Sequence, residues 1–241
     1  MVKMIRLVCV GLMALVVWGD PSSEVQFTDC TEFVGTGQVP LAKAQSFVPP
    51  SFQIAVGPGQ TATLVVRAAQ CKAVKVDNGA PEAGALTQFG IVVVAPEGDG
   101  DINNYTIGYA TTSRRLAQRL ERSGLPVSVD GDLAYEVAGG NLFVESSPGD
   151  AASFFLHGPV VDPVPGSFFP FLANWWYESK KGRMKMATSI PSIGFGNSAV
   201  ALFCRLDSPL GFLTGTNRFG PFTGFNIRGI FATGRMVVST R

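Results

Sequence analysis

The chain has 241 residues, of which 46% are apolar and only 15% are charged, so it can bury a substantial core. The low charged fraction, together with 28 glycines and 16 prolines, excludes a coiled coil and a charged disordered tail. The 19 basic side chains offset 18 acidic ones to a net charge of +1, which argues against nucleic acid as a partner.

The pattern of residues 1–19 predicts a secretory signal peptide. A short basic start is followed by a continuous apolar run over residues 7–18, and Val17 and Gly19 are small enough for a cleavage site. That run is shorter than the ~20 residues needed to cross a bilayer, and no later segment is long enough. We therefore expect a secreted or periplasmic protein with a single domain over residues 23–241 and no transmembrane span after signal removal. An uncleaved anchor is the alternative.

The cysteines allow one disulfide, and the sequence leaves its pairing undecided. Cys9 would leave with the signal, and Cys30, Cys71 and Cys204 would remain. Two of these could pair in an oxidising compartment, and the sequence does not say which. They are far apart in the sequence and His157 is the only histidine, so we expect no metal site.

Short β-prone segments alternate with turn clusters from residue 23 onward, at a spacing typical of a sandwich or barrel. The clearest segments are residues 61–67, 71–76, 86–94, 198–206 and 225–238.

One helix is predicted over residues 111–124. Thr and Ser precede it as caps, Leu116 and Leu120 lie one turn apart, and Gly124 follows as a stop. Its basic face is explained by solvent exposure, with an anionic partner as the alternative. That face carries Arg114, Arg115, Arg119 and Arg122.

A hairpin is predicted over residues 132–145, because Gly139 and Gly140 permit the positive φ angles of a two-residue turn. Alternation then places Glu136 and Glu145 on the face opposite its apolar side chains, as solvated carboxylates rather than a catalytic pair. The apolar face consists of Leu133, Tyr135, Val137, Leu142 and Val144.

Serine-hydrolase, phosphate-loop and dinucleotide-binding motifs are absent from the sequence. It contains no G-x-S-x-G turn, and His157 stands alone. The glycines at residues 35–37 and 57–59 lack the phosphate-loop lysine and the full dinucleotide pattern, so they are interpreted as turns. We expect no cofactor.

Aromatic residues are dense between residues 154 and 231, and in a closed β-sheet such rings can line an interior cavity. Arg67 shares a strand face with Val65 and Ala69, and the same parity groups Trp176 with Glu178. The candidate ligand-binding residues are Arg67, Tyr109, Trp176 and Glu178. For each of them a purely structural role is the alternative.

Several segments, taken in order, resemble the acetoacetate decarboxylase-like superfamily. They are Phe47-Val-Pro-Pro-Ser-Phe52, Tyr105-Thr-Ile-Gly-Tyr-Ala-Thr-Thr-Ser, Ser123-Gly-Leu-Pro-Val127 and Trp176-Tyr-Glu-Ser-Lys-Lys-Gly-Arg183. The resemblance extends from about Val39 to Val238. It implies a mostly β fold, a cone-shaped antiparallel barrel with one or a few short helices around an apolar cavity.

The family's decarboxylases place a Schiff-base lysine after a Gly-aromatic/Leu-Pro step. Here Val127 follows Gly124-Leu125-Pro126, and valine cannot form an imine. The resemblance thus implies the fold and the cavity but transfers no catalytic residue.

Together these observations predict an exported barrel that binds a small apolar or weakly acidic, keto acid-like ligand without Schiff-base chemistry. Arg67 would pair with a carboxylate or keto oxygen, Tyr109 would donate a hydrogen bond, and Trp176 would stack. One alternative is a lyase or hydratase/isomerase acting on keto or enol substrates with Glu178 as general base. Another is a structural or assembly protein, and a homo-oligomer is left open.

Overall fold

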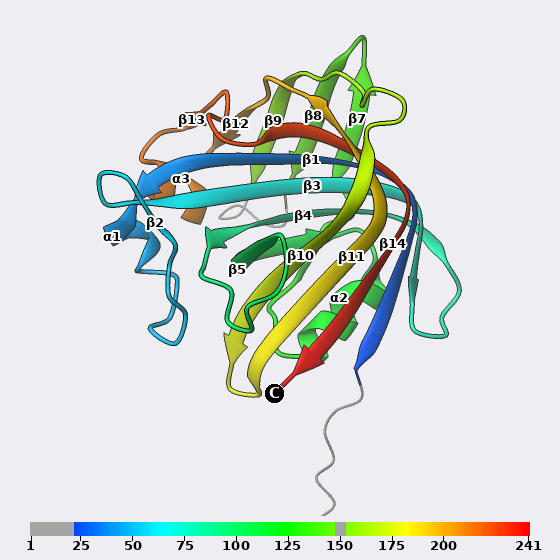
Figure 1. Cartoon of the computed structure of the whole chain (residues 1–241), viewed down its shortest axis with the longest axis horizontal. Helices are drawn as coiled ribbons and strands as arrows, with labels where there is room; N and C mark the ends of the chain where they lie inside the picture. The colour runs from blue at the N-terminus through cyan, green and yellow to red at the C-terminus, as the bar shows by residue number, and fades with distance from the viewer. Residues whose placement is uncertain (1–21, 148–152) are drawn as a thin grey trace, which may run out of the picture.

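Seven long strands close into a barrel in the computed structural model, which describes residues 22–147 and 153–241 (Figure 1). All neighbouring pairs are antiparallel except β10 and β5, which run parallel. The mostly antiparallel barrel expected from the sequence is confirmed. Around the barrel the strands are β1 (Ser23–Pro40), β14 (Asn226–Thr240), β11 (Gly182–Asn197), β10 (Phe168–Ser179), β5 (Ile102–Thr111), β4 (Glu82–Val92) and β3 (Thr61–Val76), and β3 pairs again with β1. Two short strands, β2 (Val56–Gly57) and β6 (Ser128–Val129), pair with β3 and β5.

The segments 61–67 and 71–76 form one strand rather than two. The intervening residues keep their register with β1, as in the pairing of Ala69 with Glu32, so the strand is not interrupted. Gln70 in this stretch pairs with Thr31 of β1 and Ala85 of β4.

A second sheet of five strands covers one outer side of the barrel (Figure 1). Its buried face shares one hydrophobic core with the outward-facing side chains of the barrel wall, for example Leu142 and Leu156 with Leu64 and Ile91. In order, its strands are β13 (Arg218–Phe219), β12 (Ala201–Cys204), β9 (Phe154–Pro159), β8 (Asn141–Ser146) and β7 (Ala134–Ala138).

The predicted hairpin is confirmed as β7 and β8. Gly139 and Gly140 have φ angles of 56° and 74°, as a two-residue turn of this kind requires. Tyr135 lies opposite Val144 and is buried, whereas Val137 near the turn is 38% exposed. Glu136 and Glu145 are both exposed, as predicted.

The predicted helix is α2 (Arg114–Arg122), and two short helices, α1 (Leu41–Ala44) and α3 (Pro209–Thr214), lie in connections. The Ser113 hydroxyl accepts the Leu116 N–H at 3.1 Å, and Gly124 follows the helix with a φ of 101°. Leu116 and Leu120 enter the core inside the barrel, where they join Met184 and Met186. Helix α2 therefore fills one end of the barrel.

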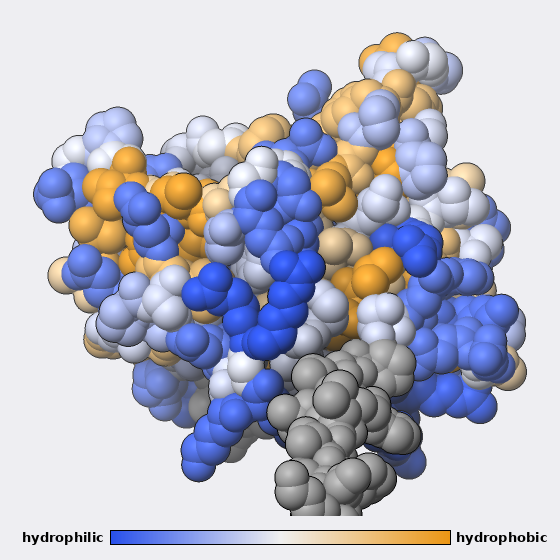
Figure 2. All heavy atoms as spheres, turned by 60° about the horizontal axis from the view of Figure 1, so that its bottom comes forward, coloured by the Kyte–Doolittle hydropathy of each residue, from blue (hydrophilic) through white to orange (hydrophobic). Residues whose placement is uncertain are grey.

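Figure 2 shows the lower side of Figure 1 turned forward, with hydrophilic residues over much of its middle. Apolar residues gather on its left, the side of α1 and β2, where Val56 is 57% exposed. Within residues 22–147 and 153–241 no helix has the length and apolar character needed to cross a membrane. The predicted signal peptide lies outside the described residues.

Candidate functional site

The barrel interior contains a cavity of about 610 Å³ at the end away from α2. This volume falls within the range that holds drug-sized ligands. The lining residues come from all seven barrel strands and the connections before β5 and β14. They are Glu32, Val34, Thr36, Gln38, Thr63, Val65, Arg67, Val92, Asp101, Ile102, Asn104, Phe171, Ala173, Trp175, Thr188, Ile190, Phe195, Gly224, Phe225 and Ile227.

Side-chain alternation explains which residues face this space. Every second residue of β1, from Glu32 to Gln38, points inward, and so do Thr63, Val65 and Arg67 on β3. Many of these inward residues are small, and none of the helices in the described part of the chain enters this end, so the space stays unfilled.

A buried ion pair lies among the least exposed lining residues. Arg67 Nε donates to Glu32 Oε2 at 2.8 Å, and the two side chains are only 9% and 4% exposed. Gly229, opposite Glu32 on β14, makes room for this carboxylate, because a Cβ there would lie 2.8 Å from Glu32 Cγ. The pair places one positive and one negative group in an otherwise largely apolar wall.

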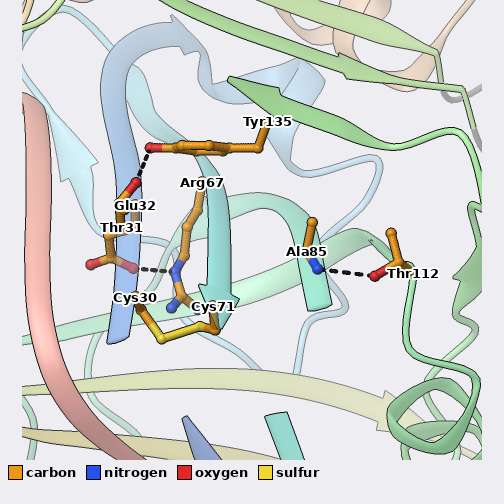
Figure 3. Close-up of a disulfide and its surroundings, with 8 residues drawn as sticks. All are labelled: Cys30, Thr31, Glu32, Arg67, Cys71, Ala85, Thr112 and Tyr135. Carbon is orange, nitrogen blue, oxygen red and sulfur yellow. Dashed lines mark hydrogen bonds and ion pairs between the residues drawn. A yellow bond between two sulfur atoms is a disulfide. The ribbon is translucent and has the colours of Figure 1, made fainter. Parts of the chain in front are cut away.

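The strands that carry this pair are joined just beside it (Figure 3). Cys30 and Cys71 face each other across β1 and β3 and form a disulfide, which settles the open pairing, while Cys204 is a free thiol. Thr31 Oγ1 donates to Tyr135 Oη at 3.0 Å and so links β1 to the second sheet. Burial raises the pKa of Tyr135 to about 12, so it is neutral at physiological pH. These links hold the backbone around Glu32 and Arg67.

Two further polar side chains line the cavity without a hydrogen-bond partner among the described residues. They are Asn104, whose amide nitrogen and oxygen are both unpaired, and Thr188, whose hydroxyl is unpaired. Both residues are 1% exposed. A buried polar group without a partner costs about 1–3 kcal/mol, so these atoms are destabilising unless something in the cavity satisfies them.

Aromatic rings line the wall from the interior to the surface. Trp175 is buried, Phe171 and Phe195 are half-buried with ring centroids 5.7 Å apart, and Phe225 is 56% exposed. Phe169, 42% exposed, packs edge-on against Phe195 with the centroids 4.8 Å apart. These rings make much of the cavity wall aromatic and apolar.

The structure brings two of the four predicted site residues together. Arg67 lines the cavity. Tyr109 is buried inside the barrel, close enough for an electrostatic interaction with Arg67, but it is not among the lining residues. Burial raises the pKa of Tyr109, and the positive charge of Arg67 opposes this increase. Tyr109 is therefore a neutral phenol next to the site.

Trp176 and Glu178 lie elsewhere, on the outer side of β10. Trp176 is 1% exposed, donates from Nε1 to Asn103 Oδ1 at 3.0 Å, and packs under the Lys185 ammonium. Glu178 accepts a 2.5 Å hydrogen bond from Ser51 and borders a separate pocket beside Tyr105. Parity correctly grouped Trp176 with Glu178, but this pair faces away from the cavity.

Sequence reasoning did not identify Glu32, Asn104, Thr188 or Trp175 as lining residues. For Glu32 a usable signal exists, because Glu32, Val34, Thr36 and Gln38 alternate on one strand. Trp175 and Trp176 are adjacent, so a choice between them needs the absolute orientation of β10.

Over residues 22–147 and 153–241, no group of three or more His, Cys, Asp or Glu side chains is arranged to hold a metal ion. His157 lies on the outer face of the second sheet, with its ring centroid 4.6 Å from that of Phe143.

No protein-family model matches the chain, and no curated protein matches it in sequence. Solved structures do match. Acetoacetate decarboxylase from Legionella pneumophila aligns with a TM-score of 0.59 at 11% identity, covering 90% of this chain and 85% of that one. The chain has the acetoacetate decarboxylase-like fold. An acetoacetate decarboxylase-like enzyme from Sphingomonas wittichii aligns with a TM-score of 0.53 at 10% identity, covering 92% of both chains.

A third neighbour with this fold is the enduracididine biosynthesis enzyme MppR, solved with the condensation product of pyruvate and imidazole 4-carboxaldehyde. It aligns with a TM-score of 0.54 at 12% identity, covering 90% of this chain and 87% of that one. These neighbours are enzymes. At such low identity the likeness shows the fold alone.

Val127, which follows Gly124-Leu125-Pro126, packs in the core inside the barrel with Leu125 and Leu120. It is 9% exposed and does not line the cavity. None of the residues that line the cavity is a lysine.

Proposed function

We propose that the barrel cavity binds a small molecule with an apolar body and a carboxylate or keto oxygen, without forming a Schiff base. The observation that carries this proposal is a largely apolar cavity of about 610 Å³ with a buried arginine and two unpaired polar side chains in its wall.

Arg67 recognises the acidic or keto end of the ligand. Its bond to Glu32 uses one of five N–H donors, so the guanidinium retains donors for a second oxygen acceptor. In surroundings of low polarity such a charge-assisted bond is stronger than in water. Asn104 and Thr188 add neutral donors and acceptors for the same end.

The apolar body of the ligand packs along Trp175, Ile190 and Phe171. Each buried methylene contributes about 0.8 kcal/mol, so a six-carbon chain adds roughly 5 kcal/mol before the cost of association. The cavity volume favours a ligand of this size over a four-carbon acid.

Binding rather than Schiff-base chemistry is supported by two features. In the segment that resembles the family's lysine site, Val127 follows Gly124-Leu125-Pro126, and the residues that line the cavity include no lysine. Export fits the same proposal, because the Cys30–Cys71 disulfide is of the kind that persists in oxidising compartments.

The test is calorimetric titration with α-ketooctanoate, using methyl hexyl ketone as the matched ligand without a carboxylate. We expect the keto acid to bind the native protein at least tenfold more tightly than the ketone. In Glu32→Leu/Arg67→Met, which removes both charges, this difference should disappear while the ketone still binds. Equal binding of both ligands to the native protein would contradict the role of Arg67.

The fate of the bound ligand separates a binder from an enzyme. Proton NMR of α-ketooctanoate with the protein over hours should show broadened but undiminished signals. Borohydride added to the mixture should give no covalent adduct by mass spectrometry. Loss of the ligand signal, or a lysine adduct, would contradict the proposal and identify turnover or imine formation.

A further inference from the structure

The outer face of the five-stranded sheet carries a stripe of aromatic side chains. Phe143, Phe155, His157 and Phe203 are all half-buried and lie next to one another. The ring centroids of Phe155 and Phe203 are 6.0 Å apart, and those of Phe155 and His157 are 5.9 Å apart. The opposite face of this sheet already packs against the barrel, so only this face is available to a partner.

Charges of opposite sign flank the stripe. Strand register aligns Glu145, Phe155, Phe203 and Arg218 in one row across β8, β9, β12 and β13. Glu145 and Arg218 are both exposed, and the Arg218 guanidinium lies 5.7 Å from the centre of the Phe203 ring. A second exposed carboxylate, Glu136, lies on the acidic side in the next row.

We propose that this face is the contact between two copies of the chain, packed face to face about a two-fold axis parallel to the strands, midway between β9 and β12. Because of the order of the strands, this symmetry pairs opposite charges. β8 and β13 are each one strand beyond the central pair, so the two-fold rotation brings Glu145 of each copy opposite Arg218 of the other. Phe155 of each copy then faces Phe203 of the other.

The charge arrangement favours a second copy over other occupants. A uniformly charged partner would meet repulsion at one edge of the stripe, whereas a reversed copy of the same row meets attraction at both edges. Packed sheets lie about 10 Å apart, which leaves room for one interdigitated layer of aromatic side chains. Such a contact is isologous, as two-fold dimers require.

Charge reversal tests this pairing directly. In Glu145→Arg every copy presents like charges at both edges, and in Arg218→Glu the same is true with the opposite sign. Sedimentation velocity over a range of concentrations should show a dimer for the native protein and a dissociation constant at least tenfold higher for each single variant.

Mixing the two single variants should restore the dimer. The arginine introduced at position 145 of one copy then meets the glutamate introduced at position 218 of the other, and the native pair forms at the second edge. The double variant Glu145→Arg/Arg218→Glu should also dimerise within about threefold of the native constant, since each pair is only reversed. Restoration by mixing is a result that misfolding of either variant could not produce.

Substitutions of two phenylalanines, one inside the stripe and one outside it, locate the interface. Phe155→Ser should abolish the dimer, whereas Phe212→Ser on α3, outside the stripe, should leave it intact. The unique imidazole of His157 reports the same contact by NMR, because its signals should shift with protein concentration. A monomer at all concentrations would overturn the proposal, as would a dimer that Phe155→Ser and both charge reversals leave unchanged.

Discussion

The two halves of the barrel interior are built from the same strands but are filled differently. Around α2 the interior is solid, with Leu116, Leu120, Met184 and Met186 all at most 1% exposed and in one core. Beyond Arg67 the same strands enclose about 610 Å³ of open space.

The difference comes from the size of the inward-facing side chains and from a single helix. β11 contributes Met184 and Met186 to the solid half and Thr188 to the hollow half. β10 contributes Ala173, and β3 contributes Thr63 and Val65, to the hollow half. The cavity therefore lies in the half of the barrel where inward-facing side chains are small and which α2 does not fill.

The largest predicted effect on stability comes from removing one of the two paired charges, Glu32 and Arg67, at the boundary between the halves. Arg67→Met leaves Glu32 buried and unpaired, so the free energy of unfolding should fall by about 3–5 kcal/mol. Glu32→Leu/Arg67→Met removes both charges and should lie within about 1 kcal/mol of the native protein or above it. Urea denaturation measures both. A double variant as unstable as the single one would show that the pair is needed for folding.

Two isoleucines on β11 compare a residue packed in the core with one that lines the cavity. Ile193 is 0% exposed and surrounded by core, whereas Ile190 is 2% exposed and lines the cavity. Ile193→Ala should cost about 2–5 kcal/mol, and Ile190→Ala should cost at least ~1 kcal/mol less, because one side of it already lacks packing contacts. Equal losses in thermal or urea unfolding would indicate that the cavity is closed in solution.

Substituting one of two adjacent asparagines on β5 should have a smaller effect on stability, and of opposite sign. Asn104→Leu removes two unpaired buried polar atoms and should stabilise the protein by about 1–3 kcal/mol while weakening binding of α-ketooctanoate. Asn103→Leu is the control, because its amide is bonded to Asp99 and Trp176 and its loss should destabilise. Destabilisation by Asn104→Leu would mean that the Asn104 amide is satisfied in the native protein.

The last prediction concerns the loss of stability at alkaline pH. Burial raises the pKa of both Tyr105 and Tyr135 to about 12, whereas the unfolded chain ionises near pH 10. Between these values the unfolded state releases protons that the folded state retains, so the contribution of these two tyrosines to stability should be level below about pH 10 and fall as pH rises to about 12. Ultraviolet titration of tyrosinate together with urea unfolding measures this. Ionisation of both residues near pH 10 in the folded protein would contradict it.

Local sequence signals predicted the elements that depend on local physics. Gly139 and Gly140 gave the hairpin turn, and a capping Ser113 with Gly124 bounded the helix. Alternation around Arg67 placed its side chain inside the barrel.

The remainder depends on pairings that no local pattern encodes. Cys30 and Cys71 are 41 residues apart and meet only because β1 pairs with β3. Asn104 has an asparagine neighbour on the opposite face of its strand, so its exposure to the cavity follows only from the register of the closed barrel.

The pair Trp175 and Trp176 tests the account of the cavity most directly, since they are neighbours on opposite faces of β10. Tryptophan fluorescence is recorded during titration with α-ketooctanoate in the native protein, Trp175→Phe and Trp176→Phe. The account predicts a saturable change that persists in Trp176→Phe and is lost in Trp175→Phe. A change that follows Trp176 instead, or saturable binding that leaves Trp175 fluorescence unaltered, would place the ligand outside the barrel and contradict the account.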